Sequence, residues 1–155
     1  MSLLAIAKKF ASVINWVPFI NSIVVKHGNK FSVKGALLIG CKVRLKGVNN
    51  SITIGRGTVL YKTRITINGE GNSLKIGDDC VIKQAAFVYE DDENAICVGN
   101  NTRMMGEILV ACLEGRSIEI GSGCLFSSEI EIRTSVSHSL LDEQGKRINQ
   151  ADNIS

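Results

Sequence analysis

The 155-residue sequence has little of what marks several common classes of protein. It has one proline and 5% aromatic residues, and its five cysteines form no CxxC pair. Because an odd number of cysteines leaves at least one thiol unpaired, we expect a reducing, cytoplasmic location rather than a disulfide scaffold. The basic residues are scattered and the formal net charge is only +3, which argues against a nucleic-acid-binding surface.

Long unbroken apolar runs are also absent from the sequence. Residues 3–25 are mostly apolar, but Lys8, Lys9, Asn15 and Pro18 interrupt them. A membrane-spanning helix needs about 20 consecutive apolar residues, and a signal peptide carries its charges before its apolar region. We therefore expect neither. The first apolar residues of this stretch follow a 3.6-residue spacing, which predicts a helical segment.

Glycine is abundant, with 15 residues, and four of them mark an internal repeat. The chain from Ser51 to His138 repeats with a period of 22 residues and no insertion. Each row contains an aliphatic residue followed by glycine, in the pairs Ile54-Gly55, Ile76-Gly77, Val98-Gly99 and Ile120-Gly121. Four such pairs at equal spacing predict a solenoid in which each row is one coil.

Alternation within each row predicts which side chains face the interior. Equivalent positions of a coiled parallel sheet stack about 4.8 Å apart, so each column becomes a ladder of similar residues. Two aliphatic positions in each row are separated by one residue, as a strand with one buried face requires. The predicted core residues are Ile52, Ile54, Leu74, Ile76, Ile96, Val98, Ile118 and Ile120. The glycine that follows each pair is expected to supply a positive φ or to allow a close backbone approach.

A column of small residues predicts an inward-facing turn position. Its members are Thr58, Cys80, Thr102 and Cys124. Cys80 and Cys124 lie two coils apart, about 9.6 Å by the stacking distance, which is too far for a disulfide. We expect both cysteines to serve packing.

The repeat also indicates where the solenoid begins. Residues 43–45 match residues 65–67 one period later, so a partial coil is expected from about Leu37. We divide the chain into an N-terminal helical cap and entry segment, residues 1–36, and a parallel β-helix with corner loops, residues 37–155. The helix is expected to cap the open end of the solenoid, and contact with a membrane surface is the alternative.

The handedness does not follow from the period, because leucine-rich repeats and right-handed helices use similar lengths. The leucine-rich pattern is absent. The Ile-Gly pairs instead resemble the hexapeptide repeat of left-handed β-helix proteins, whose coils have three faces of about six residues. The resemblance implies an all-β fold, a left-handed parallel β-helix, with an N-terminal helical segment.

The segment from Ile118 to Ile154 carries a closer resemblance. Its runs IGSGCLFSS, IEIRT, SHS and GKRIN are similar to those of bacterial hexapeptide-repeat acetyltransferases that modify polysaccharides and other carbohydrates. In that family the histidine of an Arg-Thr-x-Asp-x-His-Ser stretch is the catalytic base, and His138 takes its place here. The resemblance implies transfer of an acetyl group from acetyl-CoA to a hydroxyl of a carbohydrate acceptor.

A single histidine suits this chemistry. Attack of a sugar hydroxyl on a thioester needs a base that accepts the hydroxyl proton near neutral pH, and imidazole titrates in that range. Glu114 stands close to the column of His138, one coil below, so its carboxylate is a candidate to orient the imidazole and stabilise the imidazolium. A solvated corner glutamate is the alternative. Arg133, Ser137 and Asp142 are candidates for contact with the acceptor.

Two departures from the family pattern leave a second function open. Position 136 is Val where the family usually has Asp, and family members continue with coils that form most of the acetyl-CoA groove and a second wall at a trimer interface. We therefore expect a β-helix that is truncated at its C-terminal end, and a homo-oligomer that is a trimer if full-length. A non-catalytic scaffold is the alternative function. A carbonic anhydrase on the same scaffold needs three histidine ligands. Only His27 and His138 are present, so no metal is predicted.

Overall fold

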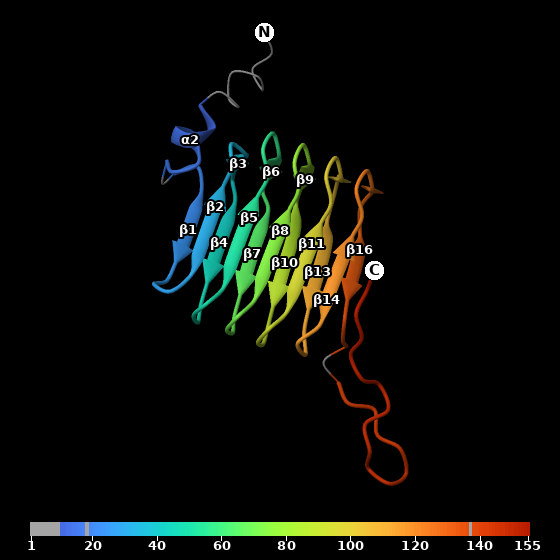
Figure 1. Cartoon of the computed structure of the whole chain (residues 1–155). Helices are drawn as coiled ribbons and strands as arrows, with labels where there is room; N and C mark the ends of the chain where they lie inside the picture. Colours follow the sequence, from blue (N-terminus) through green and yellow to red (C-terminus); the bar gives the residue numbers. More distant parts are fainter. Residues whose placement is uncertain (1–9, 18, 137) are drawn as a thin grey trace.

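The computed structural model describes residues 10–17, 19–136 and 138–155. The predictions made for residues 1–9 and for Ser137 therefore lie outside the described residues. The strands form three parallel sheets that wind together into a β-helix (Figure 1). Sheet A has the order β1-β4-β7-β10-β13-β16, sheet B the order β14-β11-β8-β5-β2, and sheet C the order β15-β12-β9-β6-β3.

Each coil contributes one strand to sheet B, then one to sheet C, then one to sheet A. The strand bounds are β1 Ser22–Val25, β2 Lys30–Val33, β3 Leu37–Ile39, β4 Lys42–Leu45, β5 Ser51–Ile54, β6 Val59–Tyr61, β7 Arg64–Ile67, β8 Ser73–Ile76, β9 Val81–Lys83, β10 Ala85–Tyr89, β11 Ala95–Val98, β12 Arg103–Met104, β13 Ile108–Cys112, β14 Ser117–Ile120, β15 Leu125–Phe126 and β16 Ile130–Arg133. Five coils of three strands thus follow β1, and the all-β parallel solenoid expected from the repeat is confirmed.

The register of sheet C, and that of sheet B from β5 onward, reproduces the 22-residue period. Ser51 pairs with Ser73, and Ala95 pairs with Ser117. In sheet A, however, Ala85 pairs with Ile108, a shift of 23 residues. The chain has one extra residue between β12 and β13 and one residue fewer between β13 and β14. The two changes cancel, so the row length stays at 22 residues and the sequence repeat does not reveal them.

The solenoid begins at Ser22, upstream of the expected start near Leu37. β1 pairs with β4, and β2 pairs with β5, so residues 22–33 already belong to the coils. Residues 22–25, which we placed in the N-terminal helical segment, therefore form a strand instead. Ile23 and Val25 pack against the solenoid core, which requires the two-residue period of a strand.

The described part of the N-terminal segment contains one short helix, α2 (Ala11–Ile14). Ala11 is buried against Leu37 and Val59, on the outer face of sheet C. α2 thus packs on the outer face of sheet C, and Trp16, just after it, contacts Phe31 of the first coil. The capping role expected for the N-terminal segment stays a prediction. A longer N-terminal helix stays a prediction, as does its contact with a membrane surface. Among the described residues no helix is long and apolar enough to cross a bilayer.

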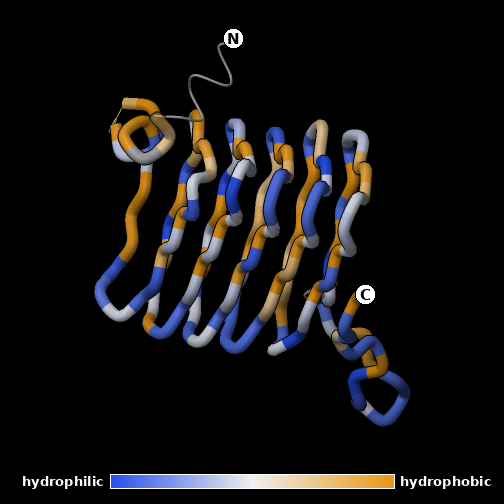
Figure 2. The backbone as a smooth tube through the Cα atoms, turned by 45° about the horizontal axis from the view of Figure 1, so that its top comes forward, coloured by the Kyte–Doolittle hydropathy of each residue, from blue (hydrophilic) through white to orange (hydrophobic). Residues whose placement is uncertain are grey.

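The core is a continuous stack of aliphatic ladders inside the coils. All eight residues predicted to be buried are at most 8% exposed, and the prediction is confirmed. In sheet A, Val43, Ile65, Phe87 and Val110 stack in one column along the solenoid, and each is at most 1% exposed. Figure 2 shows hydrophobic and hydrophilic residues alternating along the coils, as strands with one buried face require.

Three of the four repeated glycines, Gly55, Gly77 and Gly99, allow a close approach between coils rather than a positive φ. A Cβ atom on Gly77 would lie 2.4 Å from Asn100 Oδ1 and 2.8 Å from the Asn100 backbone nitrogen. The positive φ of this corner falls two residues later, for example at Asp79 with φ of 55° and Asn101 with φ of 57°. Aspartate and asparagine tolerate this left-handed conformation better than other non-glycine residues.

The small column serves as a ladder of hydrogen bonds between coils. Thr58 Oγ1 donates to the Gly77 carbonyl at 2.7 Å, and Thr102 Oγ1 donates to the Gly121 carbonyl at 2.8 Å. Cys80 occupies the same position and is fully buried, and burial raises the pKa of its thiol. Cys80 and Cys124 are both free, in agreement with the predicted packing role.

A second ladder, of asparagines, lies at the corner before sheet B. Asn50, Asn72 and Asn94 are all buried. The Asn72 backbone N–H donates to Asn50 Oδ1, and the Asn94 backbone N–H donates to Asn72 Oδ1, each at 2.9 Å. The next coil places Arg116 in this column, and its backbone N–H donates to Asn94 Oδ1 at 3.2 Å.

Candidate active site

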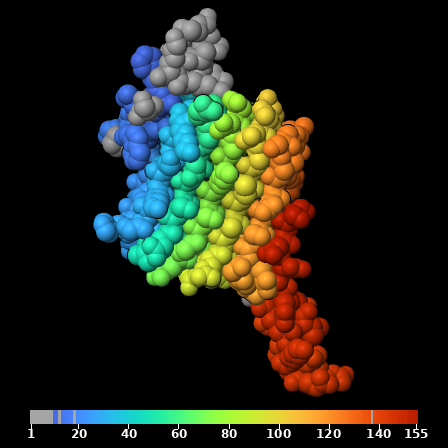
Figure 3. Space-filling view, viewed as in Figure 1, coloured from blue at the N-terminus to red at the C-terminus, as the bar shows by residue number. Residues whose placement is uncertain are grey.

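After β16 the chain leaves the coils as a projecting loop, residues 134–151, which we call the finger (Figures 1 and 3). Thr134 anchors its start, because Thr134 Oγ1 donates to the Leu113 carbonyl at 3.0 Å and accepts the Leu113 N–H at 2.8 Å. The finger ends where the chain returns to sheet B. There Ile154 forms a parallel bridge with Ile118, so the chain re-enters the register of the solenoid.

The two arms of the finger pair in an antiparallel manner. Leu141 and Arg147 form an antiparallel bridge, and the Ile148 N–H donates to the Leu140 carbonyl at 2.8 Å. Asp142 shapes the turn at the tip, since its Oδ1 accepts backbone N–H groups from Gln144 at 3.0 Å and Lys146 at 2.8 Å. The finger is therefore a defined hairpin-like element.

His138 lies on the outgoing arm of the finger and is exposed. Asn149 on the returning arm holds its backbone, because Asn149 Nδ2 donates to the His138 carbonyl at 2.5 Å. Asn149 Oδ1 accepts the Leu140 N–H at 2.7 Å and Arg147 Nε at 3.3 Å. The imidazole is thus presented to solvent from a backbone that is tied across the finger.

Glu114 connects the finger to the coil below it. Arg147 binds the carboxylate with both terminal nitrogens, Nη1 to Oε2 at 2.8 Å and Nη2 to Oε1 at 2.7 Å. Ser135 Oγ donates to Oε1 at 2.5 Å. The backbone N–H of Glu114 donates to Asp91 Oδ2 at 2.7 Å, which fixes the corner that carries the carboxylate.

This arrangement differs from the expected contact between Glu114 and His138. Both carboxylate oxygens are bound by Arg147 or Ser135, and none of the hydrogen bonds that the described residues make joins Glu114 to His138. The hydrogen bonds from Arg147, and then from Ser135, lower the pKa of Glu114 from 4.5 to about 2. In return, Glu114 raises the pKa of Arg147. Glu114 is therefore ionised at neutral pH and serves to dock the finger through Arg147.

The remaining predicted residues have different surroundings. Arg133 is exposed and pairs with Glu131, two residues before it on β16. Asp142 lies at the turn of the finger, where its carboxylate binds backbone N–H groups. Ser137 lies outside the described residues. Val136 is 59% exposed beside the histidine segment. The structure thus brings Asp142 and His138 onto one finger and leaves Arg133 on the sheet.

Arg147 and Asn149 are the two residues whose role the sequence reasoning missed. Both lie in the run GKRIN, which forms part of the family resemblance but suggests no partner for either residue. Arg147 is 33 residues from Glu114 along the chain, outside the single 22-residue period that predicted neighbours. The only signal for this pair in the sequence was a carboxylate at a coil corner, Glu114, followed downstream by an arginine, Arg147.

Two surface pockets lie near these elements. One, of about 550 Å³, is formed between Arg116 at the coil corner and the returning arm of the finger, where it is lined by Asp142, Lys146, Arg147 and Asp152 among others. The second, of about 590 Å³, lies along the edge of sheet A and is lined by Lys62, Arg64, Glu107, Glu129 and Glu131 among others. Only the first includes residues of the finger.

Solved structures of acetyltransferases resemble this chain. It matches the polysialic acid O-acetyltransferase OatWY with a TM-score of 0.68 and 25% sequence identity, over 86% of this chain and 61% of that chain. It matches the polySia-specific acetyltransferase NeuO with a TM-score of 0.51 and 20% identity, over 86% of this chain and 59% of that chain. At 20% identity the likeness to NeuO shows the fold alone.

The chain therefore spans about three-fifths of the length of the solved structures that it matches. No protein-family model and no curated protein matches the sequence. The structural match supports the resemblance to hexapeptide-repeat β-helix acetyltransferases that the glycine and histidine motifs suggest.

Proposed function

We propose that this protein is an O-acetyltransferase that moves an acetyl group from acetyl-CoA to a hydroxyl of a carbohydrate. The structural match to the polysialic acid O-acetyltransferase OatWY, over 86% of this chain, is the observation that carries the proposal. By the same comparison, the acceptor is a polymer of sialic acid. A left-handed coil, a cytoplasmic location and a trimer belong to the same proposal.

His138 is the proposed general base. Its imidazole accepts the proton of the acceptor hydroxyl while the hydroxyl oxygen forms a bond to the thioester carbonyl carbon. The carbon–sulfur bond then breaks, and the thiolate of coenzyme A leaves and takes up a proton. No covalent bond to the protein is needed. Exposure of His138 on the finger supports this role, since a polymeric acceptor must reach the base from solvent.

Glu114 acts in this mechanism through Arg147 rather than through the imidazole. Its carboxylate docks the returning arm of the finger, and Asn149 on that arm holds the His138 carbonyl. Glu114 is therefore a positioning residue in our proposal. Arg133, Ser137 and Asp142 stay candidates for contact with the acceptor.

Substitution of the histidine tests the proposal directly. His138→Ala should lower turnover of acetyl-CoA and polysialic acid at least about 100-fold, because a general base contributes at least that factor. Release of the coenzyme A thiol measures the rate. His27→Ala is the matched control, since His27 is the only other histidine and is exposed on the corner between β1 and β2.

Near-normal turnover by His138→Ala would contradict the role of the base. Calorimetry with acetyl-CoA separates an enzyme from a non-catalytic scaffold. Binding in the micromolar range supports the acetyltransferase, whereas turnover and binding both at background would favour the scaffold.

A further inference from the structure

The asparagine ladder changes its residue type at the coil from which the finger departs. Asn50, Asn72 and Asn94 are at most 1% exposed, and the amide of each bonds to backbone groups of its own or the neighbouring coil. Arg116 holds the next position of this column and is partly exposed. A long cation thus replaces a buried amide at the base of the finger.

Arg116 carries a buried donor without a partner. Its Nε atom is inaccessible to solvent and makes no hydrogen bond in the described part of the chain. Buried donors are nearly always paired in folded proteins, so an unpaired one marks either an unfavourable local arrangement or a place for a ligand. The asparagines of the ladder are fully paired, so none of them takes up this donor. Because Nε itself lies below the surface, the guanidinium offers all its donors to a ligand only when the side chain turns toward the pocket.

The pocket of about 550 Å³ opens beside this side chain. Most of the other charged groups on its wall already have partners. Arg147 is bound to Glu114. Asp142 Oδ1 accepts the backbone N–H groups of the finger turn, and Asp152 Oδ1 accepts the Asn153 N–H at 2.8 Å. Arg116 and Lys146 are therefore the two cations of this wall that form no salt bridge among the described residues, beside the negative charges of Asp142 and Asp152.

We propose that Arg116 binds the carboxylate of an acidic sugar, so that the pocket is the acceptor subsite for carboxylate-bearing carbohydrates. The inference rests on the proposed acetyltransferase function for its biological meaning. A guanidinium group matches a carboxylate because its fixed nitrogens donate two parallel hydrogen bonds. Lys146 on the same wall adds a second positive charge.

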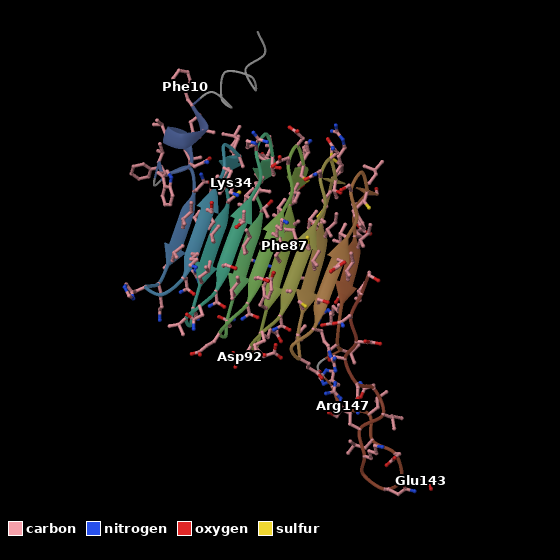
Figure 4. The ribbon with its side chains drawn as sticks, in the orientation of Figure 1. Phe10, Lys34, Phe87, Asp92, Glu143 and Arg147 are labelled. Carbon is pink, nitrogen blue, oxygen red and sulfur yellow. The ribbon has the colours of Figure 1, made fainter. Side chains whose placement is uncertain are left out.

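The subsite adjoins the arm of the finger that holds the His138 backbone. Asn149 holds the His138 carbonyl, and its chain neighbours Ile148 and Gln150 both line the pocket. Figure 4 shows Arg147 where the finger leaves the coils. A sugar held by its carboxylate at Arg116 would therefore contact the returning arm, whose Asn149 ties the His138 backbone.

Binding measurements test the subsite without any acetyl transfer. The probes are a trimer of sialic acid and the same trimer after its carboxyl groups are reduced to alcohols, titrated by calorimetry in the absence of acetyl-CoA. The wild-type protein should bind the carboxylate form more tightly. Arg116→Gln should weaken binding of that form roughly 10- to 100-fold, the usual effect of a hydrogen bond to a charged group, and should leave the reduced form unchanged.

Arg103→Gln is the matched control, since Arg103 is exposed on β12 and lies on sheet C. A second measurement needs no variant: phenylglyoxal modifies accessible arginines, and the trimer should protect Arg116 but not Arg103, as read by peptide mass spectrometry. The subsite is overturned if the wild type binds both trimers equally or neither, or if Arg116 reacts at the same rate with and without the trimer.

These outcomes separate the subsite from the proposed function. Selective, Arg116-dependent binding without any turnover supports the subsite and counts against the acetyltransferase. Turnover with equal KM for acidic and neutral sugars, unchanged in Arg116→Gln, supports the acetyltransferase and rejects the subsite.

Discussion

Single residues in this β-helix are selected by the coil above them rather than by their neighbours in sequence. Gly77 shows this when it is compared with Gly121, because both follow a buried aliphatic residue and neither has a positive φ. A Cβ atom on Gly77 would meet Asn100 Oδ1 at 2.4 Å. On Gly121 the nearest atom would be Cys124 Sγ at 3.8 Å, an ordinary contact.

Alanine at these two positions should therefore have opposite consequences. Gly77→Ala should lower the free energy of unfolding by about 1–3 kcal/mol, the usual cost of forcing extra atoms into packed structure. Gly121→Ala should change it by less than about 1 kcal/mol, because the backbone conformation and the space both admit a methyl group. Urea unfolding followed by circular dichroism measures both. Equal destabilisation by the two variants would show that conformation, rather than the approach of the next coil, selects glycine.

At the scale of elements, the finger depends on one ion pair with the coil that it leaves. Arg147 and Ser135 hold the pKa of Glu114 at about 2, below its ordinary value of 4.5. A group whose pKa is lowered by folding stabilises the folded state above its unfolded pKa. The docking of the finger should therefore be complete above about pH 4.5 and be lost as the pH falls toward 2.

Nuclear magnetic resonance titration of the Glu114 carboxyl carbon should show this directly. In the wild-type protein the midpoint is expected near pH 2. Arg147→Met should raise it toward 4.5, since the largest cause of the shift is removed. Arg133→Met is the control, because Arg133 pairs with Glu131 on β16. A midpoint that stays near 2 in Arg147→Met would mean that another group holds the carboxylate.

At the scale of the whole molecule, the finger carries several large apolar side chains that no described residue covers. Val136, Leu140, Leu141 and Ile148 are each at least 59% exposed. Apolar side chains gathered on one projecting element commonly mark an interface. This supports the proposed trimer, in which the finger of one subunit packs on the next.

Light scattering should give a mass about three times the 16.8 kDa of the chain. Leu141→Glu should lower the mass to that of the single chain, because a charge in an apolar interface is costly to bury. Leu125→Glu is the matched control, since Leu125 is 73% exposed on β15, away from the finger. A wild-type protein that is monomeric at micromolar concentration would contradict the assembly.

The period of the sequence and the alternation inside it determined the solenoid, the stacked core columns and the absence of a Cys80–Cys124 disulfide. These features repeat, so each coil predicts the next. Three features needed the tertiary structure. The strand at Ser22–Val25 depends on its pairing with β4. The partner of Glu114 is Arg147, which lies 33 residues later in the sequence and is brought back to the coil by the finger. That Nε of Arg116 lacks a partner, and that a pocket lies beside this residue, can be seen only in the folded structure. A repeat specifies contacts one period apart, and contacts made by a loop that leaves the repeat are decided by where that loop folds back.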